Sequence, residues 1–438
     1  MSAPSRLARR LRTGDAVIVG LGSMVGAGIF AALAPAARAA GSALLLGLVL
    51  AGSVAYCNAN SSARLAARYP ESGGTYVYGR YRLGDLWGYL AGAAFIVGKT
   101  ASCAAMALTF GHYVAAGEAR PLAITAVVLL TAVNLAGIDK TAGVTRAIVF
   151  LVVATLAIFA AAAFGGGTVD TSHLTESHGG ALGILRSGGI LFFAFAGYAR
   201  IATLGEEVDA PARTIPRAIS IALALALALY GIVALAALLA APASLLASTE
   251  TPLRAVVHAG DRAALAPAVQ VGAAVASAGV LLSLLAGVSR TVFAMAANRH
   301  LPAALAKVDE QRRVPHRAEV LVGAVVVAIA ALTDIGAAIG FSSFCVLFYY
   351  AVANASALTL GRRLMPAIGL VGCVLLAFAL PFGAVIGGTA TIAAAMLLYP
   401  AARIGAAGRL GRRESTPRDA GCSTERRDRE PARRSEPG

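Results

Sequence analysis

Apolar runs of about 20 residues recur along almost the whole chain, and each is long enough to cross a hydrocarbon core of roughly 30 Å as a helix. Stretches such as 219–239 are apolar on every side, whereas the strands of a membrane barrel alternate apolar and polar residues. Of the 438 residues, 58% are hydrophobic and 13% are charged. In soluble domains, roughly a quarter of all residues are charged. The sequence therefore predicts an all-α integral membrane protein.

Twelve membrane-spanning helices account for the apolar runs. Their expected ranges are 15–34, 41–63, 86–115, 121–137, 143–165, 184–205, 217–241, 265–296, 317–333, 336–359, 364–381 and 384–402. Arginines precede the first run, but that run is about 19 residues long and lacks a convincing cleavage site, so we interpret it as a retained helix. An even number of spans places both termini on one side of the membrane.

The distribution of Lys and Arg indicates which side this is. The connections on the side of the termini contain Arg64, Arg68, Arg80, Arg82, Lys140, Arg213, Arg217, Arg299, Lys307, Arg312, Arg313, Arg362 and Arg363. The opposite connections contain Arg38, Arg120, Arg186, Arg254 and Arg262. By the positive-inside rule, both termini are expected to be cytoplasmic in a multi-pass protein of the cytoplasmic membrane. The polar segment 403–438 is rich in Arg, Glu, Pro and Ser, and we expect a disordered basic cytoplasmic tail there.

Several function classes are disfavoured by the composition. The net charge of +15 comes from loops and tail, so it reflects topology, and no nucleic-acid partner is expected. The five cysteines are scattered without a C-x-x-C pair, so neither a metal site nor a disulfide framework is expected. A membrane-embedded enzyme would need paired acids or a metal constellation within the spans, and the sequence shows neither an H-E-x-x-H motif nor an intramembrane histidine cluster. No cofactor is expected.

The first span contains an unusual density of glycine in the segment 20–30, GLGSMVGAGIF. Each glycine weakens a helix by about 1 kcal/mol relative to alanine, so the helix is expected to break at mid-membrane. The freed N–H groups can hold a carboxylate and the freed carbonyls an ammonium group or a cation. A G-x-x-x-G packing face at Gly22 and Gly26 is the competing interpretation and is compatible with a break. A dinucleotide loop is excluded, since strand and downstream acid are missing.

The sixth span offers a counterpart to this motif. Small residues interrupt the aromatic segment 191–198, LFFAFAGY, at mid-depth. Broken helices at corresponding places of two halves are a sequence signature of transporters built from inverted repeats.

Four ordered motifs carry a family resemblance. They are the first-span segment 22–30, the segment 69–76 (YPESGGTY) after span two, Glu206-Glu207 with Pro211 and 215–219 (IPRAI), and Ser289-Arg290 through Asn298 to Leu301-Pro302 after span eight. Together they resemble the amino acid, polyamine and organocation (APC) permease superfamily up to about residue 402. The resemblance implies a five-plus-five inverted repeat with discontinuous helices 1 and 6 and alternating access to a midplane site. The expected parts are 1–12 (N-terminus), 13–165 (spans 1–5), 166–360 (spans 6–10), 361–402 (spans 11 and 12) and 403–438 (tail).

The resemblance also implies a substrate site on the two broken helices. Ala27 and Gly28 would offer N–H groups to the substrate carboxylate, while Met24, Phe193, Ala194 and Ala196 would offer carbonyls to its amino group. Phe193 corresponds to an aromatic residue that caps the substrate in such permeases, with a packing or lipid-facing aromatic as the alternative. The full expected substrate-binding set is Ser23, Met24, Gly26, Ala27, Gly28, Ile29, Phe193, Ala194, Phe195, Ala196 and Gly197.

Two further residues are candidates for coupling or selectivity. Some proton-coupled relatives carry a lysine in span five, but the corresponding segment 152–156, VVATL, has none. Thr155 offers a hydroxyl for sodium there, although a threonine that bonds its own helix is the plainer account. Lys99 lies near the middle of span three, where a charge costs about 3 kcal/mol unless it faces a cavity, so it is a functional candidate with a structural alternative.

The predicted function is a secondary active transporter for an amino acid or related small amine, coupled to protons, sodium or a counter-substrate. A polyamine or cationic amino acid antiporter is the alternative. No acid is visible at the predicted pocket positions, and Lys99 would repel a second positive charge. A transporter-like nutrient sensor is a further alternative, for which a sizeable folded cytoplasmic domain would be expected.

Overall fold

The computed structural model describes residues 12–26, 28–69, 73–137, 142–166, 169–198, 201, 208, 210–309, 312 and 314–407. Within these ranges the regular structure is helical, and the β pairing is an isolated bridge between Gly41 and Ser177. The longer helices are α1 (Thr13–Met24), α2 (Gly28–Ala40), α3 (Leu44–Arg68), α5 (Asp85–Val114), α6 (Ala119–Leu135), α7 (Ala142–Gly165), α8 (Gly180–Phe195), α10 (Pro211–Ala240), α13 (Ala266–Ala297), α14 (His316–Leu332), α15 (Ile335–Leu358), α16 (Leu364–Ala379) and α17 (Phe382–Ala407). Shorter elements are α4 (Thr75–Leu83), α11 (Ala243–Ala247), α12 (Pro252–Ala259) and the 3-10 turns η1 (Ala116–Glu118), η2 (Thr171–Thr175), η3 (Ala196–Tyr198), η4 (Ala263–Leu265) and η5 (Ala303–Ala306).

The helical architecture confirms the expected membrane-protein class. In the described part of the chain, nine helices are long and apolar enough to span a membrane, or ten if α1 and α2 form one bent span. α14 and α16 occupy the expected ninth and eleventh spans but have only 17 and 16 residues. The count of twelve spans and the inverted repeat therefore stay predictions.

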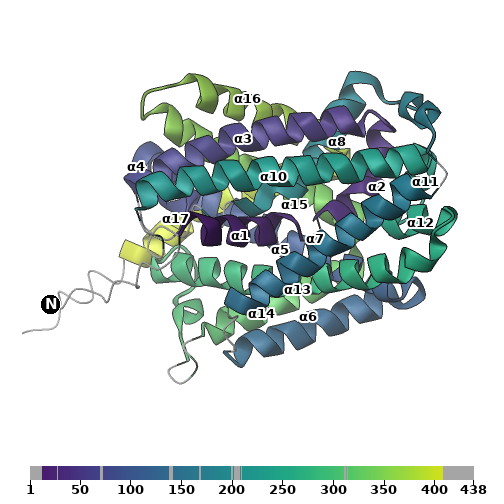
Figure 1. The fold of residues 1–438 in the computed structure, drawn as a ribbon. Helices are drawn as coiled ribbons and strands as arrows, with labels where there is room; N and C mark the ends of the chain where they lie inside the picture. The colour runs from purple at the N-terminus through teal and green to yellow at the C-terminus, as the bar shows by residue number, and fades with distance from the viewer. Residues whose placement is uncertain are drawn as a thin grey trace, which may run out of the picture.

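The helices form a bundle with distinct ends. α3, α10, α13 and α6 run roughly parallel to one another, while α4 lies at one end and α11 and α12 lie at the other (Figure 1). Within the spans α5 and α15, 72% of the most apolar window is buried in the protein, compared with 17% in α17. α5 and α15 are therefore central helices, and α17 lies at the periphery.

Small residues allow the central helices to approach closely, as is common between helices in lipid. A Cβ placed on Gly98 of α5 would lie 2.7 Å from the Cβ of Cys345 on α15. α3 and α8 approach each other in a similar way, since a Cβ on Gly47 would lie 2.9 Å from the backbone nitrogen of Gly188. The many alanines and glycines of the sequence thus bring backbones together without leaving space between them.

The first span is discontinuous, as its glycine content predicts. α1 ends at Met24 and α2 begins at Gly28, and the two helix axes differ in direction by 45°. In the expected sixth span, α8 ends at Phe195 and is followed by the 3-10 turn η3. The regular α-helix is therefore interrupted in both places where the sequence predicts a break.

Candidate functional site

The two interrupted helices contact each other at their breaks. Gly197 of η3 lies so close to α1 that a Cβ there would overlap the carbonyl of Ser23 and lie 2.7 Å from the backbone nitrogen of Met24. A Cβ on Gly28 would lie 2.7 Å from the Cα of Ala194. Glycine at these two positions is what permits backbone to meet backbone. The sequence-predicted residues of the two spans are therefore brought together in one place.

Tyr230 joins the two breaks from a third helix, α10. Its hydroxyl lies 2.5 Å from the carbonyl oxygen of Met24 and 3.2 Å from that of Ala194, and donates to them. The ring packs edge-on against Phe195, with 5.2 Å between the centroids. Tyr230 is fully buried. Two carbonyls that we expected to receive a substrate amino group thus accept a hydrogen bond from the protein in this structure.

Replacing Tyr230 with phenylalanine is expected to destabilise the protein. The ring and its contact with Phe195 remain, but two buried carbonyls lose their donor, which costs about 1–3 kcal/mol. The check is a lower midpoint of thermal unfolding in detergent for Tyr230→Phe than for the wild type. Tyr56→Phe, which alters a tyrosine that is 45% exposed, is the matched control. Equal midpoints for Tyr230→Phe and the wild type would show that the hydroxyl does not hold the breaks together.

Lys99 reaches the second break from the central helix α5. Its Nζ donates to the carbonyl oxygen of Ala196 at 3.4 Å, and the hydroxyl of Tyr350 on α15 donates to the same oxygen at 3.4 Å. Lys99 is 8% exposed, and among the described residues no carboxylate lies within 4.0 Å of it. A buried lysine that is bonded to the backbone of a broken helix is thus part of the candidate site.

Aromatic rings surround this part of the site. Tyr350 stacks on Tyr198 with 5.0 Å between the centroids and meets Phe192 edge-on at 5.8 Å. Phe192 and Phe195 are fully buried, whereas Phe193 is only partly buried against the core. Phe193, the predicted capping residue, is therefore the most accessible of the three phenylalanines.

Other predicted residues lie close to the breaks but make contacts of their own. A Cβ on Gly26 would overlap the side chain of Val280 on α13, and Ile29 is fully buried. The hydroxyl of Ser23 donates to the carbonyl of Val19 within α1. The hydroxyl of Thr155 on α7 donates to the Leu151 carbonyl of its own helix at 2.8 Å. This bond is the structural alternative to a role in sodium coordination. Ala27, Glu206, Glu207 and the tail beyond residue 407 lie outside the described residues.

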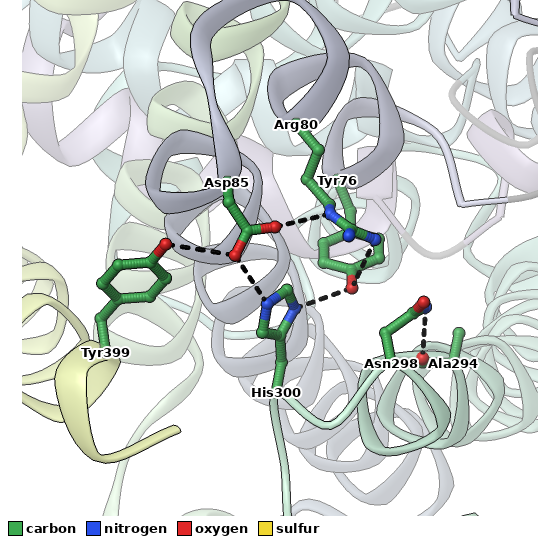
Figure 2. A network of polar contacts seen from close by, with 7 residues as sticks. All are labelled: Tyr76, Arg80, Asp85, Ala294, Asn298, His300 and Tyr399. Atoms are coloured by element: carbon green, nitrogen blue, oxygen red, sulfur yellow. Dashed lines mark hydrogen bonds and ion pairs between the residues drawn. The ribbon is translucent and has the colours of Figure 1, made fainter. Parts of the chain in front are cut away.

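A second polar cluster, centred on Asp85, joins four segments at the end of the bundle where α4 lies (Figure 2). One oxygen of Asp85 accepts from Arg80 Nε at 2.8 Å. The other lies 3.2 Å from His300 Nε2 and accepts from the Tyr399 hydroxyl at 3.1 Å. The other ring nitrogen of His300 lies 2.8 Å from the Tyr76 hydroxyl. The cluster therefore connects α4, the start of α5, the segment after α13 and α17.

Burial governs the protonation of this cluster. Desolvation lowers the pKa of His300 below its usual value, while its contact with Asp85 acts in the opposite direction. Burial likewise raises the pKa of the Tyr76 phenol, which stays neutral and available as a hydrogen-bond partner. The guanidinium of Arg80 also lies over the Tyr76 ring, 5.4 Å from its centroid. The arrangement clamps α4 to the bundle.

Tyr230, Tyr350 and the Asp85 cluster were not predicted from the sequence. Tyr230 gave a usable signal, because it is the only residue with a polar side chain between 221 and 240. Tyr76 and His300 lie within or beside two of the segments that carry the family resemblance. Asp85 and Tyr399 gave no such signal, since they lie at the ends of apolar runs where polar residues are ordinary.

The sequence is similar to an amino acid permease family and to proteins named as transporters. The sequence model of a family described as amino acid permease matches residues 11–404. A Mycobacterium tuberculosis protein named as an uncharacterized transporter is 59% identical over 410 residues, which is 92% of this chain and 93% of its own length. Cationic amino acid transporter 7, chloroplastic, of Arabidopsis thaliana is 26% identical over 80% of this chain and 65% of its own. The methylthioribose transporter of Bacillus subtilis is 28% identical over 77% of this chain and 78% of its own.

Proposed function

The chain belongs to the amino acid permease family, and from that premise we propose that it is a secondary active transporter of an amino acid. It moves its substrate across the cytoplasmic membrane by alternating access. The observation that carries this proposal is the contact between the α1–α2 break and the α8–η3 break through Gly197 and Gly28. Discontinuous helices that meet within a bundle supply the backbone groups with which transporters bind small zwitterions.

The proposed architecture is the five-plus-five inverted repeat, with spans 1–5 in 13–165 and spans 6–10 in 166–360. The interruption of the first helix of each half supports it. In this arrangement both termini are cytoplasmic. The end of the bundle that carries α4 and η5 is then the cytoplasmic end, in agreement with the basic residues Arg80, Arg82 and Lys307 near these elements.

The site as described is closed. Met24, Ile29, Ala194 and Ala196 are at most 2% exposed. The carbonyls of Met24, Ala194 and Ala196 already accept hydrogen bonds from Tyr230, Lys99 or Tyr350. An entering ammonium group therefore replaces protein donors with its own, so opening the breaks and binding the substrate are parts of one step.

Lys99 favours a neutral or anionic amino acid as the substrate. Its ammonium group bonds the Ala196 carbonyl beside the two breaks, so a substrate that carries a second positive charge is repelled more strongly than a zwitterion. A cationic amino acid or polyamine antiporter is the second candidate, supported by the likeness to the Arabidopsis cationic amino acid transporter. The likeness to the methylthioribose transporter adds that solute to the compounds worth testing.

Uptake into proteoliposomes tests the proposal. Labelled leucine, glutamate, lysine, ornithine, putrescine and methylthioribose are offered separately, with proton and sodium gradients imposed one at a time. We expect accumulation of a neutral or anionic amino acid above that in protein-free liposomes. Preferential uptake of lysine, ornithine or putrescine would establish the second candidate. Transport of methylthioribose without any amino acid would overturn both.

Phe193→Ala is expected to weaken substrate binding. A partly buried ring beside the two breaks can cover a bound substrate, and its loss should raise KM by about tenfold with a smaller change in kcat. Phe193→Trp should preserve much of the affinity. The measurement is concentration-dependent uptake in proteoliposomes. Phe150→Ala, which removes a ring that is 77% exposed on α7, is the control. An unchanged KM in Phe193→Ala would identify Phe193 as a packing residue.

A further inference from the structure

Glu319 is a buried acid that the substrate site does not use. It lies in the first turn of α14 and is only 2% exposed. α14 packs against α5, α6 and α13. Glu319 therefore points into the bundle and not towards lipid or water.

Polar side chains of α13 and α6 lie beside the carboxyl group. Ser289 and Asn134 both interact with it, yet the hydroxyl of Ser289 already donates to the Leu285 carbonyl and the amide of Asn134 to the Leu282 carbonyl. Oε2 of Glu319 is buried and has no hydrogen-bond partner among the described residues. The second N–H of the Asn134 amide can serve one carboxyl oxygen, but Oε2 keeps no donor, whereas in a protonated carboxyl group this oxygen carries the proton.

The charges around Glu319 do not neutralise it. Arg290 of α13 is the cation whose field reaches Glu319, but it is exposed and, within the described part of the chain, no Lys, Arg or His nitrogen lies within 4.0 Å of the carboxylate. α6 contributes the neutral Asn134, and α5 contributes the thiol of Cys103. An unpaired carboxylate inside a membrane protein is far less stable than its protonated form.

The position of Glu319 also connects it to the substrate site. Cys103 lies within electrostatic range of both Glu319 and Lys99, and Cys103 and Lys99 are one turn apart on the same face of α5. A change in the charge of Glu319 is therefore felt next to the residue that bonds the Ala196 carbonyl.

From these observations we propose that Glu319 is a proton-binding site that couples uptake to the proton gradient. The proposal rests on the transport function given above. In each cycle the carboxylate takes up a proton, forming the O–H bond, and is neutral while the bundle is closed. It releases that proton to the cytoplasmic side when α14 and its neighbours separate and water reaches the carboxyl group. One proton thus crosses with each substrate.

The opposing account is that Glu319 is a charged residue that stabilises the N-terminus of α14. Acids in the first turn favour the helix by about 0.3–1 kcal/mol. This account predicts that Glu319→Gln lowers the unfolding midpoint but leaves the response to a pH gradient intact.

The test compares gradient-driven accumulation with exchange in proteoliposomes. Glu319→Gln is expected to lose at least about tenfold in accumulation driven by an inward proton gradient, while exchange of labelled for unlabelled substrate stays within about twofold of the wild type. Glu319→Asp keeps a titratable group and should restore gradient-driven accumulation with a shifted pH profile. Glu118→Gln, at an exposed position of η1, is the matched control. Full gradient-driven accumulation by Glu319→Gln would overturn the proposal.

Infrared spectroscopy measures the protonation of Glu319 directly and needs no substrate. The wild type is expected to show the carbonyl stretch of a buried protonated carboxylic acid at neutral pH, and Glu319→Gln should lack it. If the wild type transports no amino acid, the proposed function fails, and this band alone decides whether Glu319 holds a proton. If Glu319→Gln loses both exchange and accumulation, the band again decides: its absence from the wild type overturns the proposal.

Discussion

Gly197→Leu is expected to abolish transport. The Cβ of any other residue at this position would overlap the carbonyl of Ser23 and approach the nitrogen of Met24, and these are backbone atoms that cannot rotate away. The two breaks would be forced apart, and the backbone groups that form the candidate site would lose their mutual placement. Uptake of the preferred substrate in proteoliposomes should fall to the level of protein-free liposomes, a loss of at least about a hundredfold, since misplacement by about 1 Å has effects of that size.

The control for this change is Gly231→Leu on α10. Nothing lies within 4 Å of a Cβ at Gly231, so leucine fits there and should leave uptake near the wild-type level. Size-exclusion profiles and membrane yield show whether each variant is inserted and folded. Normal uptake by a folded Gly197→Leu protein would mean that substrate does not bind between the breaks.

The spans were predictable because lipid imposes a simple rule on the chain. A helix that satisfies its own backbone and is apolar for about 20 residues leaves a strong sequence signal. α13 covers Ala266–Ala297 against an expected 265–296, and α15 covers Ile335–Leu358 against 336–359. α8 instead begins at Gly180, before the expected 184, and Arg186 lies inside both the expected and the observed helix. We counted Arg186 among the connections, but it lies within a helix, where its guanidinium donates to the Ala379 carbonyl at 3.1 Å.

The α1–α2 break was predictable for a different reason, namely that glycine weakens a helix locally. What the sequence did not reveal is which side chains occupy the breaks. The hydroxyl of Tyr230 reaches the Met24 carbonyl across 206 positions of the chain, and the surroundings of Glu319 on α14 combine residues from α5, α6 and α13. Such contacts depend on helix rotation and depth, which periodicity within one span does not fix. Short elements in the connections, such as α4 and α11, leave no 20-residue signal either.

Lys99 was a candidate from the sequence, and in the structure it contacts the second break. Its depth in the third span made it a candidate, and the structure shows its Nζ on the Ala196 carbonyl of the second break. Tyr350 donates to the same oxygen, so a lysine is not required merely to satisfy that carbonyl. We infer that the charge itself is the useful property. With an effective dielectric constant of about 20, a second positive charge on the order of 7 Å away is disfavoured by about 2 kcal/mol, or roughly 30-fold.

Lys99→Met is therefore expected to widen the substrate range. Methionine keeps most of the side-chain length and removes the charge, so uptake of lysine and ornithine relative to leucine should rise by roughly 30-fold. Coupling to the proton gradient should stay intact, because we assign the coupled proton to Glu319. Competition of unlabelled lysine with labelled leucine in proteoliposomes measures the change, and Lys307→Met, at an exposed position, is the control. An unchanged substrate range would mean that Lys99 only stabilises the second break and does not select the substrate. Loss of proton-driven accumulation with intact exchange would transfer the coupled proton from Glu319 to Lys99.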